Sequence, residues 1–161
     1  MTVSFRPMQP SDRDFVISAW SSSYRTSHYA GLLSMRTYAD VMHREIKLII
    51  DHPSTLTIVA EEPGEVDEEG RPFLYGFIAR RAAAQRTEPP YLYYVYVKTP
   101  YRRGRTKGLE IGYAAQLFRA AGIDPRRPFE YACETSVSLQ LARKIPLGEF
   151  NSLPARFLET P

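Results

Sequence analysis

Residues 91–108 read YLYYVYVKTPYRRGRTKG, and this stretch decides the fold. Residues 91–98 are rich in aromatic and β-branched side chains, which are typical of a buried strand. Residues 99–108 contain a proline, two glycines and several arginines, so a turn is expected there. Apolar residues then recur at helical spacing from about Lys107 to Ala121. The sequence therefore predicts a unit of strand, basic loop and helix.

The loop of this unit has the chemistry of an anion site. Five basic residues and no acidic residue lie between Lys98 and Lys107. Free amides and the dipole at a helix N-terminus favour negative charge, and glycines let the backbone approach a ligand. Arginine dominates the basic residues, with 17 arginines against 4 lysines, and a guanidinium binds phosphate through two parallel hydrogen bonds. A diphosphate that bears a further phosphate suits so basic a loop.

The segments around this unit predict an α/β fold. We expect strands at residues 3–8, 55–61, 73–80 and 129–134, and helices that begin near Ser11, near Ser34 and after the last strand, where a short helix runs through Lys144. Ser11 is expected to cap the first helix, and the second is expected to end before Asp51. Three successive strands without a helical crossover form an antiparallel meander, and the late strand joins by a parallel crossover. The sheet is therefore mixed and mostly antiparallel, in a single domain over residues 1–161.

Composition excludes several classes of protein. The net charge is only +3, which by itself does not indicate nucleic-acid binding. A single cysteine, Cys133, excludes an intramolecular disulfide and a cysteine-based zinc cluster, and the three histidines lack metal-ligand spacing, so we expect no metal. No apolar stretch approaches the roughly 20 residues of a membrane span, and the first residues lack the apolar core of a secretory signal. The expected location is the cytoplasm.

The order of elements and the strand–basic loop–helix unit resemble the GNAT superfamily of acyl-CoA-dependent N-acyltransferases. In that family the loop usually reads Gln/Arg-x-x-Gly-x-Gly/Ala and its amides hold the CoA pyrophosphate, while the preceding strand pairs with the pantetheine arm. The resemblance implies acetyl-CoA as cosubstrate and direct acetyl transfer to an amine of a small molecule or a protein. The residues it implies for CoA binding are Val95, Val97, Arg102, Arg103, Gly104, Arg105, Thr106, Lys107 and Gly108.

Two registers of the loop motif are open. Anchoring it on the residues Tyr101-Arg102-Arg103 puts Arg105 and Lys107 where the family has glycine and a small residue. Sliding it to residues 105–110 restores Gly108 as the first glycine but places Glu110 at the small position. We prefer the second register because Gly108 then opens the helix.

The catalytic residues that the resemblance implies are incomplete. Many family members protonate the departing thiolate with a tyrosine of the last helix, and matching that pattern here puts Ala142 at the tyrosine position. Tyr94 and Tyr131 are the candidate acids from neighbouring strands, and Glu134 or Glu130 is a candidate base. A strand amide near Val95 or Val97 would stabilise the oxyanion.

Three alternative interpretations remain. A GNAT-fold protein without catalysis could act as a binding module for a phage or host protein, which Glu110 and Ala142 favour; the stretches 19–25, 94–98 and 101–103 resemble small bacteriophage-encoded members. The loop could also be a solvated turn without a ligand, or it could contact nucleic acid. Against nucleic acid, and in favour of a cationic acceptor, stand six acids in one loop: Glu61, Glu62, Glu65, Asp67, Glu68 and Glu69. The oligomeric state is left open.

Overall fold

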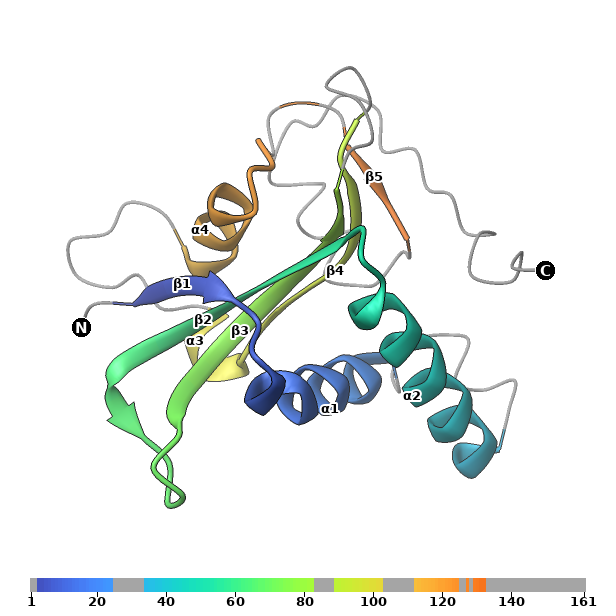
Figure 1. Cartoon of the computed structure of the whole chain (residues 1–161), viewed down its shortest axis with the longest axis horizontal. Coiled ribbons are helices and arrows are strands. Elements are labelled where there is room, and N and C mark those ends of the chain that lie inside the picture. Colours follow the sequence, from blue (N-terminus) through green and yellow to red (C-terminus); the bar gives the residue numbers. More distant parts are fainter. Residues whose placement is uncertain are drawn as a thin grey trace.

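The computed structural model describes residues 3–24, 34–82, 89–102, 112–124, 127 and 129–132. These residues form a five-stranded sheet in which the strands lie in sequence order. Among the first four strands each adjacent pair is antiparallel, whereas the fifth strand is parallel to the fourth. This confirms the mixed, mostly antiparallel α/β sheet (Figure 1). The strands are β1 (Ser4–Pro7), β2 (Thr55–Val66), β3 (Pro72–Arg81), β4 (Tyr91–Val97) and β5 (Glu130–Tyr131).

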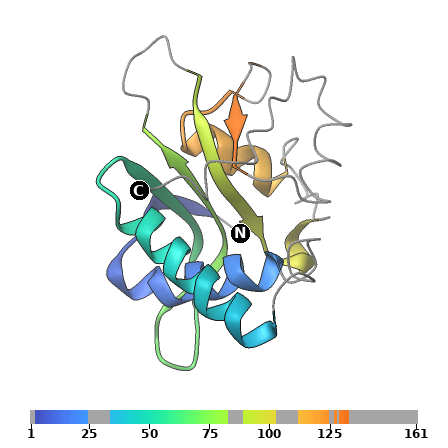
Figure 2. The same cartoon turned by 90° about the vertical axis from the view of Figure 1, so that its right-hand side faces the viewer.

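Helices cover both faces of the sheet. They are the 3-10 turn η1 (Pro10–Asp12) and the α-helices α1 (Arg13–Tyr24), α2 (Met35–Asp51), α3 (Thr99–Arg102) and α4 (Tyr113–Ala120). Helices α1 and α2 lie on one face and α4 on the other (Figures 1 and 2). The core is accordingly in two layers. One layer contains Trp20 and Ile46 from α1 and α2 with Phe77 of β3. The other contains Leu117 and Phe118 of α4 with Ile78 of β3.

Helix α2 begins and ends close to where the sequence predicts. The Ser34 hydroxyl accepts a hydrogen bond from the Thr37 amide at 3.3 Å, which makes Ser34 the N-cap. The helix ends at Asp51, one residue later than expected, two residues before Pro53. The capping prediction for the first helix is wrong. Ser11 lies within η1, and the Asp12 carboxylate accepts the Gln9 amide at 2.7 Å instead.

Two further elements differ from the prediction. Strand β2 runs on to Val66, because the hairpin ladder with β3 continues from the Glu62–Phe73 pair to the Val66–Pro72 pair. Helix α4 begins at Tyr113 rather than near Lys107, because Gly112 has an extended backbone with φ −64° and ψ 159°. The end of the strand expected at 129–134 and the helix expected through Lys144 lie outside the described residues.

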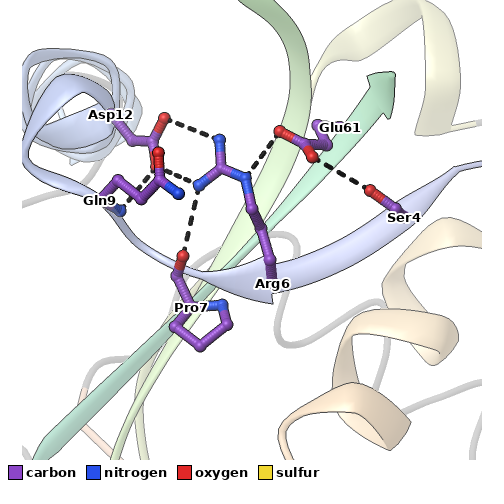
Figure 3. Close-up of polar contacts among 6 residues, drawn as sticks. All are labelled: Ser4, Arg6, Pro7, Gln9, Asp12 and Glu61. Atoms are coloured by element: carbon purple, nitrogen blue, oxygen red, sulfur yellow. Dashed lines mark hydrogen bonds and ion pairs between the residues drawn. The ribbon is translucent and has the colours of Figure 1, made fainter. Parts of the chain in front are cut away.

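Arg6 of β1 joins three segments at one side of the sheet (Figure 3). Its guanidinium donates to both carboxylate oxygens of Asp12, at 2.6 and 3.1 Å, and to Glu61 of β2 at 2.7 Å. The Ser4 hydroxyl also donates to Glu61, at 3.2 Å. The side chains are mostly buried, with exposed fractions of 20% for Arg6, 6% for Asp12 and 12% for Glu61. The hydrogen bond to Asp12, and after it the one to Glu61, raises the pKa of Arg6 above its ordinary value. This network attaches the start of α1 to the sheet.

Replacing Arg6 should therefore destabilise the fold. Arg6→Met leaves two largely buried carboxylates without their cation, and we expect the free energy of unfolding to fall by about 3 kcal/mol. Urea denaturation measures the loss. Arg71→Met is the matched control, because Arg71 pairs with Asp67 and Glu69 in an exposed turn, where loss of an ion pair has little effect. Equal effects of the two substitutions would contradict this account of the network.

Candidate functional site

The described pairs of strand β4 differ in number between its two edges. It pairs with β3 from the Arg81–Tyr91 pair to the Gly76–Val97 pair. Its ladder with β5 covers only Tyr91 and Leu92, and the last hydrogen bond runs from the Ala132 amide to the Leu92 carbonyl at 2.9 Å. No described strand lies beside residues 93–97 on the β5 side. The described part of the parallel pair thus lies at the start of β4, and the remainder of β4 runs on toward α3.

A β-bulge lies next to the described pairs of the β4–β5 ladder. Ala79 of β3 faces Tyr94 and Arg80 faces Leu92, so Tyr93 is the extra residue of β4. A bulge locally rotates the strand, and here it places both Tyr93 and Tyr94 on the side of α1 and α2. Val95 and Val97 lie on the side of α4.

The structure places the predicted acids on opposite faces of the sheet. Tyr94 is half-buried and stacks on Trp20 of α1, with ring centroids 5.2 Å apart and an interplanar angle of 13°. Tyr131 is 4% exposed and lies in the core layer beneath α4. The two hydroxyl groups are therefore not brought together. Glu130 is half-buried in β5, and Glu134 lies outside the described residues.

Of the predicted CoA-binding residues, Val95 and Val97 lie in β4 and Arg102 is the last residue of α3. The others lie outside the described residues: Arg103, Gly104, Arg105, Thr106, Lys107 and Gly108. Lys98, which also contributes to the basic stretch, has its ammonium nitrogen 3.8 Å from the centroid of the Phe73 ring and 5.2 Å from that of Phe15. Burial there lowers the pKa of Lys98. Lys98 therefore contributes to packing at the end of β4.

Gly112 is a candidate that the sequence reasoning missed. It is the N-cap of α4 and, as a glycine, has no side chain with which to cap the amides of the first turn, which are the groups that bind anions at a helix N-terminus. A Cβ at this position would meet nothing within 4 Å. The sequence signal was present, since Gly112 stands directly before the apolar run of α4. Gly112 was overlooked because the helix was expected to begin near Lys107.

Next to the start of α4, Tyr75 of β3 occupies the centre of an aromatic cluster. Tyr75 is fully buried, and its ring lies 4.3 Å from that of Tyr101 and 6.0 Å from that of Tyr113, centroid to centroid. Its hydroxyl donates to Glu62 at 2.6 Å, with Glu65 as a second acceptor at 3.1 Å. Burial, and after it the hydrogen bonds to these carboxylates, raises the pKa of Tyr75 far above its ordinary value of 10.0.

The acidic stretch 61–69 is largely occupied by contacts within the protein. Glu61 pairs with Arg6, and Glu62 and Glu65 accept the Tyr75 hydroxyl. Asp67 and Glu69 pair with Arg71. Five of its six acids therefore have partners within the fold, and this weakens the expectation that the stretch attracts a cationic acceptor.

No protein-family model matches the sequence, and no curated protein matches it. Solved structures do match. The aminoglycoside antibiotic 6'-N-acetyltransferase AAC(6')-Ih from Acinetobacter baumannii has a TM-score of 0.52 and 12% identity over 94% of this chain and 95% of that chain. The aminoglycoside N-acetyltransferase AAC(6')-Iy in complex with CoA has a TM-score of 0.53 and 14% identity, over 94% of this chain and 91% of that chain. The structure described as histone acetyltransferase HPA2 and related acetyltransferase from Corynebacterium glutamicum has a TM-score of 0.53 and 16% identity, over 89% of this chain and 83% of that chain.

These likenesses define the class of fold. At such identities they show the fold alone, and that fold is the GNAT-like one expected from the sequence. Within the described part of the chain, no group of three or more His, Cys, Asp or Glu side chains could hold a metal ion. No helix of the described residues is long and apolar enough to cross a membrane.

The Tyr75 contacts predict how stability depends on alkaline pH. The folded state keeps the Tyr75 proton above pH 10, whereas the unfolded chain releases it, so this stabilisation is complete below pH 10 and is lost as the pH rises. Above pH 10, wild-type stability should fall more steeply than that of Tyr75→Phe, by about 1.4 kcal/mol per pH unit. Denaturation at pH values from about 9 to 11 measures both slopes.

A second substitution controls for the loss of any tyrosine. Tyr93→Phe removes a hydroxyl that donates to no carboxylate in the described ranges, and it should keep the wild-type slope. If Tyr75→Phe and Tyr93→Phe give the same slope, the Tyr75 hydroxyl is not the group responsible.

Proposed function

We propose that this protein is a GNAT-type N-acetyltransferase that transfers the acetyl group of acetyl-CoA to an amine. The observation that carries the proposal is the fold, a mixed five-stranded sheet in which β4 is followed by a basic segment and then by α4. In the GNAT superfamily the strand in the place of β4 pairs with the pantetheine arm. The fold supports the same proposal, since a protein of this fold, AAC(6')-Iy, was solved in complex with CoA.

The residues around β4 and α4 fit this cosubstrate. The backbone of Val95 and Val97 would pair with the pantetheine arm, and the N-terminus of α4 at Gly112 would face the pyrophosphate. The basic residues that precede α4 would neutralise the phosphates. They and their neighbours in the proposed site are Arg102, Arg103, Gly104, Arg105, Thr106, Lys107 and Gly108.

The start of α4 adds a third register to the two that the sequence left open. When the family pattern is counted back from Gly112 as its last glycine, Lys107 takes the Gln/Arg position and Glu110 the first glycine. This register is consistent with the observed helix start, because its last residue is the N-cap of α4.

For catalysis, we assign the acid to Tyr94. Acetyl-CoA supplies the acetyl group, and CoA leaves as a thiolate that takes up a proton. Tyr94 is half-buried beside the bulge and on the face toward α1, whereas Tyr131 is buried in the opposite core layer. A strand amide near Val95 or Val97 would stabilise the charge that develops on the carbonyl oxygen. Glu134 remains the candidate base, and Tyr131 the second candidate acid.

The proposed acceptor is an amine. The two aminoglycoside acetyltransferases act on aminoglycosides by their names, which makes a small-molecule amine the proposed acceptor class here. The proposed location is the cytoplasm, as the sequence predicts. The resemblance to bacteriophage proteins and the binding-module alternative gain no support from the structural neighbours, and the residues that favoured the alternative, Glu110 and Ala142, lie outside the described residues.

Thermal unfolding with and without acetyl-CoA tests the proposed function. At about 100 times its dissociation constant, acetyl-CoA should add about 2.7 kcal/mol to the stability of the wild-type protein. Arg105→Ala should reduce this gain, because it removes a proposed phosphate partner. Arg127→Ala is the matched control, since Arg127 is 83% exposed and follows α4 on the far side from its N-terminus. Absence of any gain at millimolar acetyl-CoA would refute the proposal.

Turnover on a panel of amines separates the enzyme from a protein that only binds CoA. With an accepted amine, Tyr94→Phe should lower kcat about a hundredfold, as expected for loss of a general acid. Its stabilisation by acetyl-CoA should stay at the wild-type value. Unchanged kcat in Tyr94→Phe would remove Tyr94 from the mechanism, and binding without turnover on any amine would favour the binding module.

A further inference from the structure

Tyr75 connects two elements that the chain separates. Tyr101 lies in α3, just before residues 103–111, and Tyr113 is the first residue of α4, just after them. The Tyr101 ring meets the Tyr75 ring edge-on at 87°, and the Tyr113 ring lies nearly parallel to it at 8°. The Tyr101 and Tyr113 rings are themselves 6.1 Å apart, centroid to centroid. One buried side chain of β3 therefore touches the last turn before the basic segment and the first turn after it.

The backbone of Tyr75 adds a second connection to the same place. The Lys98 amide donates to the Tyr75 carbonyl at 2.8 Å, and the Tyr101 amide donates to the Lys98 carbonyl at 2.9 Å. Helix α3 is thus fixed to β3 through hydrogen bonds as well as through ring packing. Such a double attachment restricts both the distance and the orientation of α3 relative to β3.

The Tyr75 side chain is itself held in place at its far end. Its hydroxyl donates to Glu62, with Glu65 as second acceptor, and both glutamates belong to β2. Phe73 packs edge-on against the same ring at 5.2 Å. A buried ring fixed at its edge and at its hydroxyl has one orientation, which a packing residue needs in order to position its neighbours.

We infer that Tyr75 is a positioning residue: it fixes α3 relative to the N-terminus of α4, and so places the α4 amides that are to receive the phosphates of acetyl-CoA. The inference takes its ligand, acetyl-CoA, from the proposed function. The positioning of α3 and α4 by Tyr75 rests on the contacts described above. Tyr75 touches no reacting atom and acts through Tyr101 and Tyr113. Binding groups that are placed before the ligand arrives bind it more tightly, because less ordering remains to be done.

The test compares Tyr75 with a residue of the same strand and the same burial. Tyr75→Leu removes the ring, and Tyr75→Phe removes only the hydroxyl. Phe77→Leu is the matched control, because Phe77 is also fully buried in β3 but packs against α1 on the opposite face. Calorimetric titration with acetyl-CoA gives the affinity. Hydrogen exchange without ligand at the hydrogen-bonded amides of Tyr101 and Gln116 reports the order of α3 and of the first turn of α4.

Tyr75→Leu should weaken acetyl-CoA binding about tenfold or more, since misplacing a group by about 1 Å costs up to about a hundredfold. It should also accelerate exchange at Tyr101 and Gln116 beyond any change in Phe77→Leu. Tyr75→Phe should weaken binding less than Tyr75→Leu does, because the ring remains although its hydroxyl contacts to Glu62 and Glu65 are lost. If Tyr75→Leu does not fold, Tyr101→Leu tests the same contact from its half-buried side and should weaken binding likewise.

Equal effects of Tyr75→Leu and Phe77→Leu on affinity and on exchange would overturn the inference, since Tyr75 would then be an ordinary core residue. If the wild-type protein fails to bind acetyl-CoA, the proposed function is wrong. Exchange at Tyr101 and Gln116 then still decides whether Tyr75 fixes α3 and α4.

Discussion

Strand β4 lies so close to Gly76 of β3 that no side chain fits between them. A Cβ at Gly76 would stand 2.3 Å from the carbonyl oxygen of Tyr96 and 3.2 Å from the Cα of Val97. This close contact fixes the end of β4. Directly after it the Lys98 amide donates to the Tyr75 carbonyl, and α3 begins at the next residue. The same contact also fixes the two faces of β4, with Tyr94 against Trp20 and with Val95 and Val97 toward α4. The position of the candidate acid and the attachment of α3 to β3 both depend on this one close contact between two strands.

The strands and the two long helices follow from local sequence. Runs of aromatic and β-branched residues predicted the strands, and helical spacing together with Ser34 as N-cap predicted the ends of α2 to within one residue. The extension of β2 to Val66 was not predictable locally, because its acids look like a solvated loop. Glu62 and Glu65 instead accept hydrogen bonds from the hydroxyl of Tyr75, which comes from the neighbouring strand β3. Helix α3 was missed because it has only four residues, which include a proline and an arginine, a composition that also suits a turn.

The candidate site was predictable only in part, for a similar reason. The sequence predicts that Val95, Val97 and Tyr94 share the strand before the loop. It also predicts that the valines and Tyr94 lie on opposite faces, because side chains alternate along a strand. The bulge at Tyr93 and the position of Tyr75 could not be predicted from sequence, because both depend on register shifts against neighbouring strands. Tyr75 is the extra residue of β3 where Ala60 faces Gly76 and Glu61 faces Leu74. That shift turns its ring toward Tyr101 and Tyr113.

The central claim is that acetyl-CoA binds along the second half of β4 and at the start of α4. Amide ¹H–¹⁵N spectra of the labelled protein, recorded during titration with CoA, test it most directly. The account predicts the largest shifts at Val95, Val97 and Gly112, with none at the exposed positions Val41 and Leu48 of α2. Saturating CoA that leaves the Val95, Val97 and Gly112 amides unmoved, or that shifts only amides of α2, would contradict it.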